Sequence, residues 1–178
     1  MMLTEEEKNH LKEIARLSIR SRFENTPEPE LGIDSEILKT NCGAFVTLKI
    51  GEELRGCIGL ISAVKPLYET IIEMAQAAAF DDPRFEPLTK RESEKLEIEI
   101  SVLSPFRRII DLNEIKPGIH GIMIRHGYHS GLLLPQVATE YHWDRETFLK
   151  HTCLKAGLHP DAYLDPKTEI QIFTAEVF

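Results

Sequence analysis

Apolar residues recur every three or four positions in several stretches of this chain, which is the spacing of an amphipathic helix. The first stretch opens with Thr4 and Glu7, which form a capping box. A later stretch follows Pro66, a residue favoured at the first helical position. Another lies between Asp144, a favoured N-cap residue, and Gly157, a favoured stop. The pattern predicts helices over residues 4–22, 66–80, 135–143 and 144–155, and a short charged helix after a second capping box at Thr89 and Glu92.

Alternation of apolar and polar residues predicts the strands. It is most regular over residues 96–103, where Leu96, Ile98, Ile100 and Val102 share one face. Strands and helices are mixed without regular βαβ alternation, so we expect an α+β fold with a mainly antiparallel sheet flanked by helices. The other expected strands cover residues 43–50, 54–61, 121–126, 131–134 and 169–178.

The first two strands are expected to form a hairpin around residues 51–53. A slip of one residue would invert a strand, so their apolar faces coincide only with an odd number of loop residues. This register sets Thr47 opposite Cys57, and Lys49 opposite Arg55. A carboxylate that pairs with these two cations would come from the polar face of the strand predicted over residues 96–103, at Glu97 or Glu99.

The segment Leu54–Gly59 combines a cation, a thiol and two glycines. Residues two apart in a strand point to the same face, so Arg55 and Cys57 are expected to project together. A cation near a thiol favours the reactive thiolate. Gly56 and Gly59 remove bulk beside the thiol, which would let a ligand or another backbone approach closely.

Two interpretations of this segment stay open. In the first, Cys57 is a nucleophile or ligand, Arg55 activates it or holds an anionic substrate, and a histidine is the base. In the second, Cys57 is a small buried hydrophobe and Arg55 forms a structural bridge with Glu97 or Glu99. The first interpretation makes Cys57, Arg55 and His120 the catalytic residues, with His126, His129 and His142 as further candidates for the base.

Two proline-containing segments are expected to be irregular. Residues 26–30 predict an extended linker, and Asp81–Phe85 predicts a polar turn that ends the second helix. Asp82 and Arg84 in this turn would either fix the loop as a cap and ion pair or line a cleft beside the strand that contains Leu54–Gly59. On the second alternative, the ligand-binding residues are Gly56, Gly59, Asp82, Arg84, Glu97 and Glu99.

Composition narrows the choice of partners and location. A formal net charge of −8 disfavours nucleic acid as the main partner. Three widely spaced cysteines argue against a disulfide framework and for a reducing, cytoplasmic compartment. No apolar run is long enough to span a bilayer, and the acidic first residues do not form a secretory signal. No cofactor motif is present, and His120, His126 and His129 lack the spacing of a recognised metal site.

Several segments in the same order resemble the AMMECR family. Besides Leu54–Gly59, they are residues 79–88, 99–104, 131–137 and 148–157. Tyr163 departs from the family pattern, in which many members carry tryptophan. The resemblance covers nearly the whole chain.

The resemblance implies a single AMMECR domain over residues 1–178, with a larger lobe from both chain ends and a smaller lobe from an internal segment. It leaves the biochemical activity open and points to the six-residue signature, Leu54–Gly59, as the functional segment. Prokaryotic members are called AmmeMemoRadiSam system protein A and often occur beside Memo-type and radical-SAM proteins. The resemblance therefore implies a shared pathway, and either a ligand or catalytic site at Leu54–Gly59 or a non-catalytic interaction module.

Overall fold

The computed structural model describes residues 3–27 and 35–178. Its α+β fold contains two antiparallel sheets, which confirms the predicted class. By its internal contacts, the chain divides into two compact units. The first comprises residues 1–103 and 176–178, and the second comprises residues 104–175. The linker expected over residues 26–30 falls largely outside the described residues.

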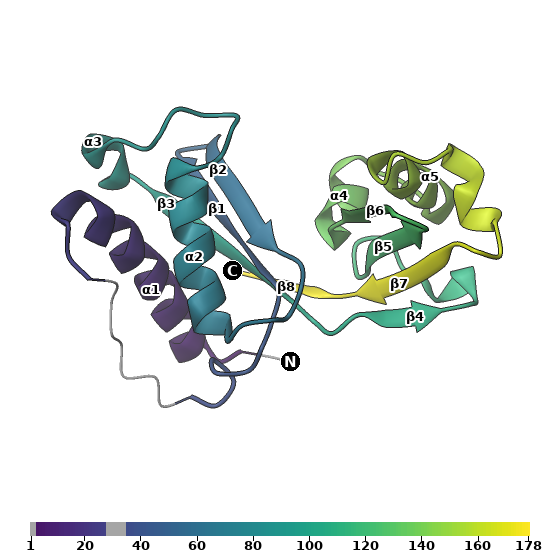
Figure 1. Ribbon diagram of the computed structural model, residues 1–178, viewed down its shortest axis with the longest axis horizontal. Helices are drawn as coiled ribbons and strands as arrows, with labels where there is room; N and C mark the ends of the chain where they lie inside the picture. Colours follow the sequence, from purple (N-terminus) through teal and green to yellow (C-terminus); the bar gives the residue numbers. More distant parts are fainter. Residues whose placement is uncertain (1–2, 28–34) are drawn as a thin grey trace. The chain divides into compact units, whose positions relative to one another are not determined.

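The first unit is a four-stranded sheet in the order β2-β1-β3-β8, with α1 and α2 on one face (Figure 1). Inward residues at alternate positions of β1 and β3 pack against these helices and form one hydrophobic cluster, as the alternation predicted. The elements of this unit are α1 (Glu5–Glu24), β1 (Ala44–Ile50), β2 (Glu53–Leu60), α2 (Leu67–Phe80), α3 (Lys90–Ser93), β3 (Glu97–Leu103) and β8 (Ala175–Val177).

The β1–β2 hairpin differs from the predicted register at one point. Thr47 lies opposite Cys57 as expected, but the register shifts after Leu48, so that Lys49 faces Leu54. Arg55 is therefore the extra residue of a β-bulge and has no partner on β1. Leu54, which faces Lys49 beside the bulge, is exposed.

The second unit has its own four-stranded sheet in the order β4-β7-β5-β6, with α5 against β5 and β6. Phe148 of α5 is fully buried in a separate hydrophobic cluster. As predicted, α5 begins after the N-cap Asp144 and ends before Gly157, which has a φ of 72°. The elements of this unit are β4 (Arg107–Ile109), β5 (Gly121–His126), β6 (His129–Leu133), α4 (Pro135–Glu140), α5 (Arg145–Lys155) and β7 (Glu169–Phe173), with 3-10 turns η1 (Leu112–Glu114) and η2 (Pro160–Leu164).

The single closing strand predicted over residues 169–178 is wrong. Residues 169–173 pair with β4 and β5 in the second sheet, whereas residues 175–177 join the first sheet beside β3. The chain changes sheets at Thr174, whose backbone exchanges hydrogen bonds with Ser104. Alternation describes each strand separately and does not show which sheet a strand joins.

Candidate functional site

Cys57 lies on β2, the edge strand of the first sheet. The preceding residue, Gly56, faces α2, so the side chain of Cys57 points to the sheet face that α1 and α2 leave uncovered. Its sulfur is 3.2 Å from the hydroxyl oxygen of Thr47, the residue opposite it on β1. Cys57 is half-buried, whereas Cys42 and Cys153 are buried, and all three are free thiols. Cys57 is therefore the most accessible cysteine of the chain.

The backbone of Cys57 is held by the turn that follows α2. Its N–H donates to Asp82 Oδ2 at 2.9 Å, and its carbonyl oxygen accepts from Arg84 Nη2 at 3.1 Å. Both groups point outward from the sheet edge, where a further strand would otherwise bond. Asp82 and Arg84 thus occupy the position of a missing strand and fix the conformation of β2 at the thiol.

Asp82 is a buried carboxylate, with a side chain only 2% exposed. Its Oδ2 lies 2.7 Å from Arg84 Nη2, and its Oδ1 accepts from both Arg84 Nε and the Arg84 backbone. The hydrogen bonds from Arg84 hold the pKa of Asp82 well below its usual range, and the amide of Cys57 lowers it further. The pKa of Arg84 is raised mainly by Asp82, with a contribution from the Cys57 side chain.

Arg84, and not Arg55, is the cation beside the thiol. The Arg84 side chain is 55% exposed, so its guanidinium also faces solvent. Arg55 is only 14% exposed and bonds in another direction, with Nε donating to Glu92 at 2.9 Å and Nη2 donating to the carbonyl of Glu86 at 2.9 Å. The expectation that Arg55 and Cys57 project together was wrong, because the bulge at Arg55 interrupts the alternation of side chains.

The structural partner expected for Arg55 was also wrong. Glu92 takes that role, while Glu99 pairs with Lys49 at 3.0 Å. Glu97 lies opposite Lys49 on β3 and is exposed. Glu92 is the residue that also closes the capping box of α3 with Thr89, and Arg55 and Thr89 together lower its pKa to about 2. Arg55 therefore ties the edge strand to α3.

The two signature glycines are in contact with the protein itself. A Cβ at Gly56 would collide with the backbone carbonyl of Ala78 in α2. A Cβ at Gly59 would meet the ring of Phe45 on β1. A helix backbone therefore fills the space beside Gly56, which confirms the close backbone approach that the sequence offered as one alternative, and an aromatic ring fills the space beside Gly59.

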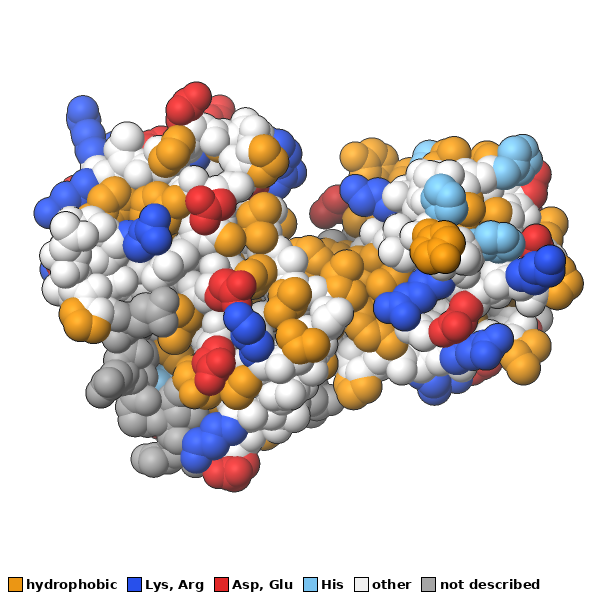
Figure 2. Space-filling view, in the orientation of Figure 1, with side chains coloured by type: hydrophobic (Ala, Val, Ile, Leu, Met, Phe, Trp, Pro, Cys, Tyr) orange, Lys and Arg blue, Asp and Glu red, His pale blue; other side chains and the backbone are white. Residues whose placement is uncertain are grey.

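The histidines proposed as bases belong to the second unit, where Figure 2 shows several histidine side chains. His120 Nδ1 accepts from the Lys116 amide at 3.2 Å, and His126 Nδ1 is 2.9 Å from the Thr168 hydroxyl. Among the residues that the structure describes, no group of three His, Cys, Asp or Glu side chains is arranged to hold a metal ion.

Sequence reasoning found part of this arrangement. It selected Cys57, Asp82 and Arg84, and the register identified Thr47 as the residue opposite the thiol. It missed that Asp82 and Arg84 bind the Cys57 backbone, and it assigned Glu92 only to a helix cap. Glu92 is 37 residues from Arg55, and no local pattern connects them.

The fold and site define an α+β protein of two units, whose first unit presents a half-buried thiol between a threonine and an aspartate–arginine clamp. The AMMECR1 family model matches residues 12–178, and the chain belongs to this family.

Archaeal proteins are similar over most of this chain. Protein NEQ441 of Nanoarchaeum equitans is 46% identical, over 80% of this chain and 83% of the relative. Protein MK0488 of Methanopyrus kandleri is 44% identical, over 99% of this chain and 89% of the relative. The crystal structure of the uncharacterized protein PH0010 from Pyrococcus horikoshii matches with a TM-score of 0.85 and 41% identity, over 94% of this chain and 88% of that one. No helix within residues 3–27 or 35–178 is long and apolar enough to cross a membrane.

Proposed function

We propose that Cys57 and Arg84 form a thiol-dependent ligand or catalytic site, in which Arg84 binds an anionic group of the substrate beside the sulfur. The observation that carries this proposal is the position of Arg84. Its guanidinium is fixed by Asp82, reaches the backbone of Cys57 and still has more than half of its side chain exposed. A fixed, exposed guanidinium suits a carboxylate or phosphate, which it can bind through two parallel hydrogen bonds.

In this proposal the residues have distinct roles. Cys57 supplies the nucleophilic sulfur, and the hydroxyl of Thr47 orients it. Asp82 is a positioning residue, because it acts through Arg84 and the Cys57 amide. Arg55, which the sequence suggested as a catalytic residue, instead stabilises the end of β2 through Glu92.

Two alkylating reagents of different charge test this proposal. We expect iodoacetamide, which is neutral, and iodoacetate, which is an anion, to label Cys57 in the native protein. Cys42 and Cys153 are internal controls, because both are buried and burial raises the pKa of each thiol. Labelling of Cys57 no faster than of these two cysteines would end the case for a reactive thiol.

Comparing the two reagents then distinguishes the effect of the Arg84 charge on the labelling rate from the effect of the accessibility of Cys57. In Arg84→Gln, iodoacetate labelling should slow about tenfold, since an oriented positive charge concentrates anions. Iodoacetamide labelling should change far less, and Arg84→Lys should retain most of the preference for the anion. Arg108→Gln, which removes an exposed cation of the second unit, is the matched control. Equal slowing of both reagents in Arg84→Gln would leave Arg84 without a role in binding anions.

A second candidate function is supported by the edge of the same strand. By the alternation of hydrogen bonds along β2, the N–H and C=O of Gly59 point outward like those of Cys57. Among the described residues, none hydrogen-bonds to them. We propose on this basis that the chain can act as AmmeMemoRadiSam system protein A, in the cytoplasm, by adding a strand of a Memo-type or radical-SAM protein to β2 at Gly59, beyond the part that Asp82 and Arg84 occupy.

Hydrogen exchange tests the second candidate without a variant. Saturation with a purified Memo-type or radical-SAM protein should protect the amide of Gly59, which has no partner among the described residues. The amide of Cys57 is the internal control, because it already donates to Asp82. A stable complex in which exchange at Gly59 is unchanged would exclude this edge as the docking site.

A further inference from the structure

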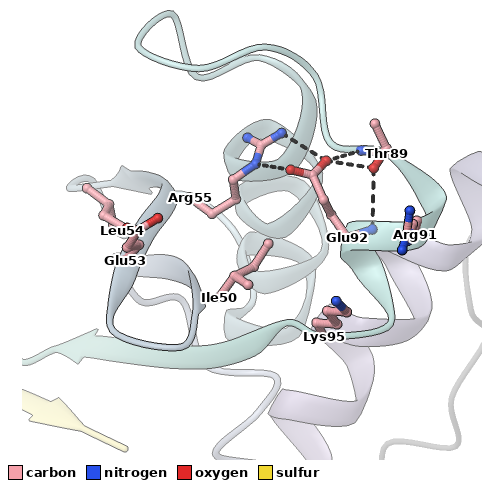
Figure 3. A pocket seen from close by; sticks show the side chains of 8 residues that line it. All are labelled: Ile50, Glu53, Leu54, Arg55, Thr89, Arg91, Glu92 and Lys95. Carbon is pink, nitrogen blue, oxygen red and sulfur yellow. Dashed lines mark hydrogen bonds and ion pairs between the residues drawn. The ribbon is translucent and has the colours of Figure 1, made fainter.

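A separate hollow of about 360 Å³ lies between the end of the β1–β2 hairpin and α3 (Figure 3). Glu53 and Leu54 lie on the hairpin side, Arg91 and Lys95 lie on the α3 side, and Ile50 lies between them. Its volume is within the range of pockets that hold small organic molecules. Cys57 does not line it, so the hollow is distinct from the proposed thiol site.

The charges around the hollow favour an anion. Arg55 and Glu92 also line it, but they neutralise each other as an ion pair. Arg91 and Lys95 are exposed, and within the described part of the chain neither side chain forms an ion pair or hydrogen bond. The remaining carboxylate, Glu53, is on the opposite side. The hollow therefore has an excess of positive charge in a chain whose formal net charge is −8.

The cations are held on a rigid support. The Thr89–Glu92 capping box fixes α3, and Arg55 binds the same glutamate from β2. Figure 2 shows basic side chains at the corner of the first unit where α3 lies. Because Glu92 is already bonded to Arg55 and Thr89, it does not neutralise Arg91 or Lys95.

The hollow also has a partly exposed apolar surface. Ile50 lies at its base, and Leu54, beside the bulge, is 41% exposed. A bare inorganic anion would leave this surface in contact with water, whereas a molecule with an apolar body would cover it.

We propose that this hollow binds a small organic anion. Its carboxylate or phosphate group would meet Arg91 and Lys95, and its apolar body would lie against Ile50 and Leu54. The Arg55–Glu92 pair would form the wall without contributing net charge.

Phenyl phosphate is a suitable probe, because it combines a phosphate group with an apolar ring. Added to the full chain, it should produce saturable amide shifts in an ¹H–¹⁵N NMR spectrum at the residues that line the hollow. Benzyl alcohol, which has the ring without the charge, should bind at least tenfold more weakly. Equal affinity for the two probes, or shifts centred elsewhere, would overturn the proposal.

A pair of double variants tests the two cations. Arg91→Gln with Lys95→Gln should weaken phenyl phosphate binding about tenfold, as expected for the loss of two exposed charge contacts. Arg108→Gln with Lys167→Gln removes the same charge from exposed positions of the second unit and should change the affinity less than twofold. Equal weakening by both pairs would show that binding follows net charge alone.

The proposal also stands apart from the thiol site. Cys57→Ser should bind phenyl phosphate as the wild type does, because Cys57 is not part of the lining. The variants at Arg91 and Lys95 should keep the wild-type rate of Cys57 alkylation by iodoacetamide. Loss of phenyl phosphate binding in Cys57→Ser would contradict a separate site.

Discussion

Asp82 connects the fold to the proposed chemistry. Its carboxylate accepts from the amide of Cys57 and from the side chain and backbone of Arg84. A buried carboxylate and the donors that bind it stabilise the fold together. Removal of the negative charge leaves all of these donors with a weaker acceptor. The conformation of β2 at the thiol therefore depends on a residue outside the six-residue signature.

Asp82→Asn should reduce the free energy of unfolding by about 2 kcal/mol, since charge-assisted hydrogen bonds are replaced by a neutral amide that also brings an N–H₂ group toward existing donors. Urea denaturation at pH 7 measures this. Asp81→Asn, at the exposed neighbouring position, is the control and should be close to neutral. A wild-type stability for Asp82→Asn would show that the clamp contributes little to folding.

The two signature glycines should differ in their tolerance of a side chain. Gly56→Ala places a Cβ against the carbonyl of Ala78, and a helix backbone cannot move aside without loss of packing, so we expect a cost of about 3 kcal/mol. Gly59→Ala places its Cβ against the ring of Phe45, a side chain that can change its rotamer more readily than a helix backbone can move, so its cost should be smaller. Thermal denaturation of the two variants gives the order, and a larger loss in Gly59→Ala would contradict this explanation.

At the scale of elements, α3 and β2 stabilise each other through Glu92. This glutamate closes the α3 capping box with Thr89 and also pairs with Arg55 in the bulge of β2. A helix of 4 residues is too short to be stable by itself, so contacts of this kind hold it in place. The same contacts shape the wall of the hollow proposed to bind an anion.

This arrangement predicts a specific acid dependence. The pKa of Glu92 is lowered from 4.5 to about 2, so its contribution to stability is present above pH 4.5 and is lost as the pH falls toward 2, where the folded state is also protonated. Wild type should therefore lose stability between pH 5 and 2 more steeply than Glu92→Gln, which cannot titrate. Urea denaturation at several pH values measures both slopes, and parallel curves would exclude Glu92 as a source of the acid dependence.

The elements also show how far the sequence could predict the fold. Alternation and capping residues identified α1, α2, α5, β1 and β3, because each has an apolar face set by its own residues. They missed β4, which has 3 residues and only one buried position. They also assigned Arg55 the wrong partners, since a bulge is created by the pairing of two strands and has no apolar period of its own.

At the scale of the whole molecule, two hydrophobic clusters correspond to the two units. Leu48 lies in the first and Phe148 in the second, and both side chains are fully buried. Each cluster is formed by a sheet and the helices packed on it. Pairing between distant strands determines the cluster to which each chain segment contributes. For this reason, the change of sheet at Thr174 could not be predicted from local patterns.

Because each unit has its own hydrophobic cluster, we expect a core substitution to promote local unfolding mainly in the unit that contains it. Phe148→Ala should cost about 4 kcal/mol and increase amide exchange mainly within residues 104–175. Leu48→Ala is the reciprocal variant and should increase exchange mainly in the first unit. Hydrogen exchange with mass spectrometry resolves the two regions, and a uniform increase over both units in either variant would indicate a single cooperative unit.

The position of β8 has a consequence for folding during synthesis. Ile100 of β3 exchanges two backbone hydrogen bonds with Phe178, so the outer edge of β3 is closed by residues that follow the entire second unit in the chain. During synthesis, the second unit can complete its sheet before the first unit does, although most of the first unit is made earlier. The edge of β3 that flanks β8 stays unpaired in the meantime. Until residues 175–178 have been translated, that edge is open to mispairing with neighbouring chains.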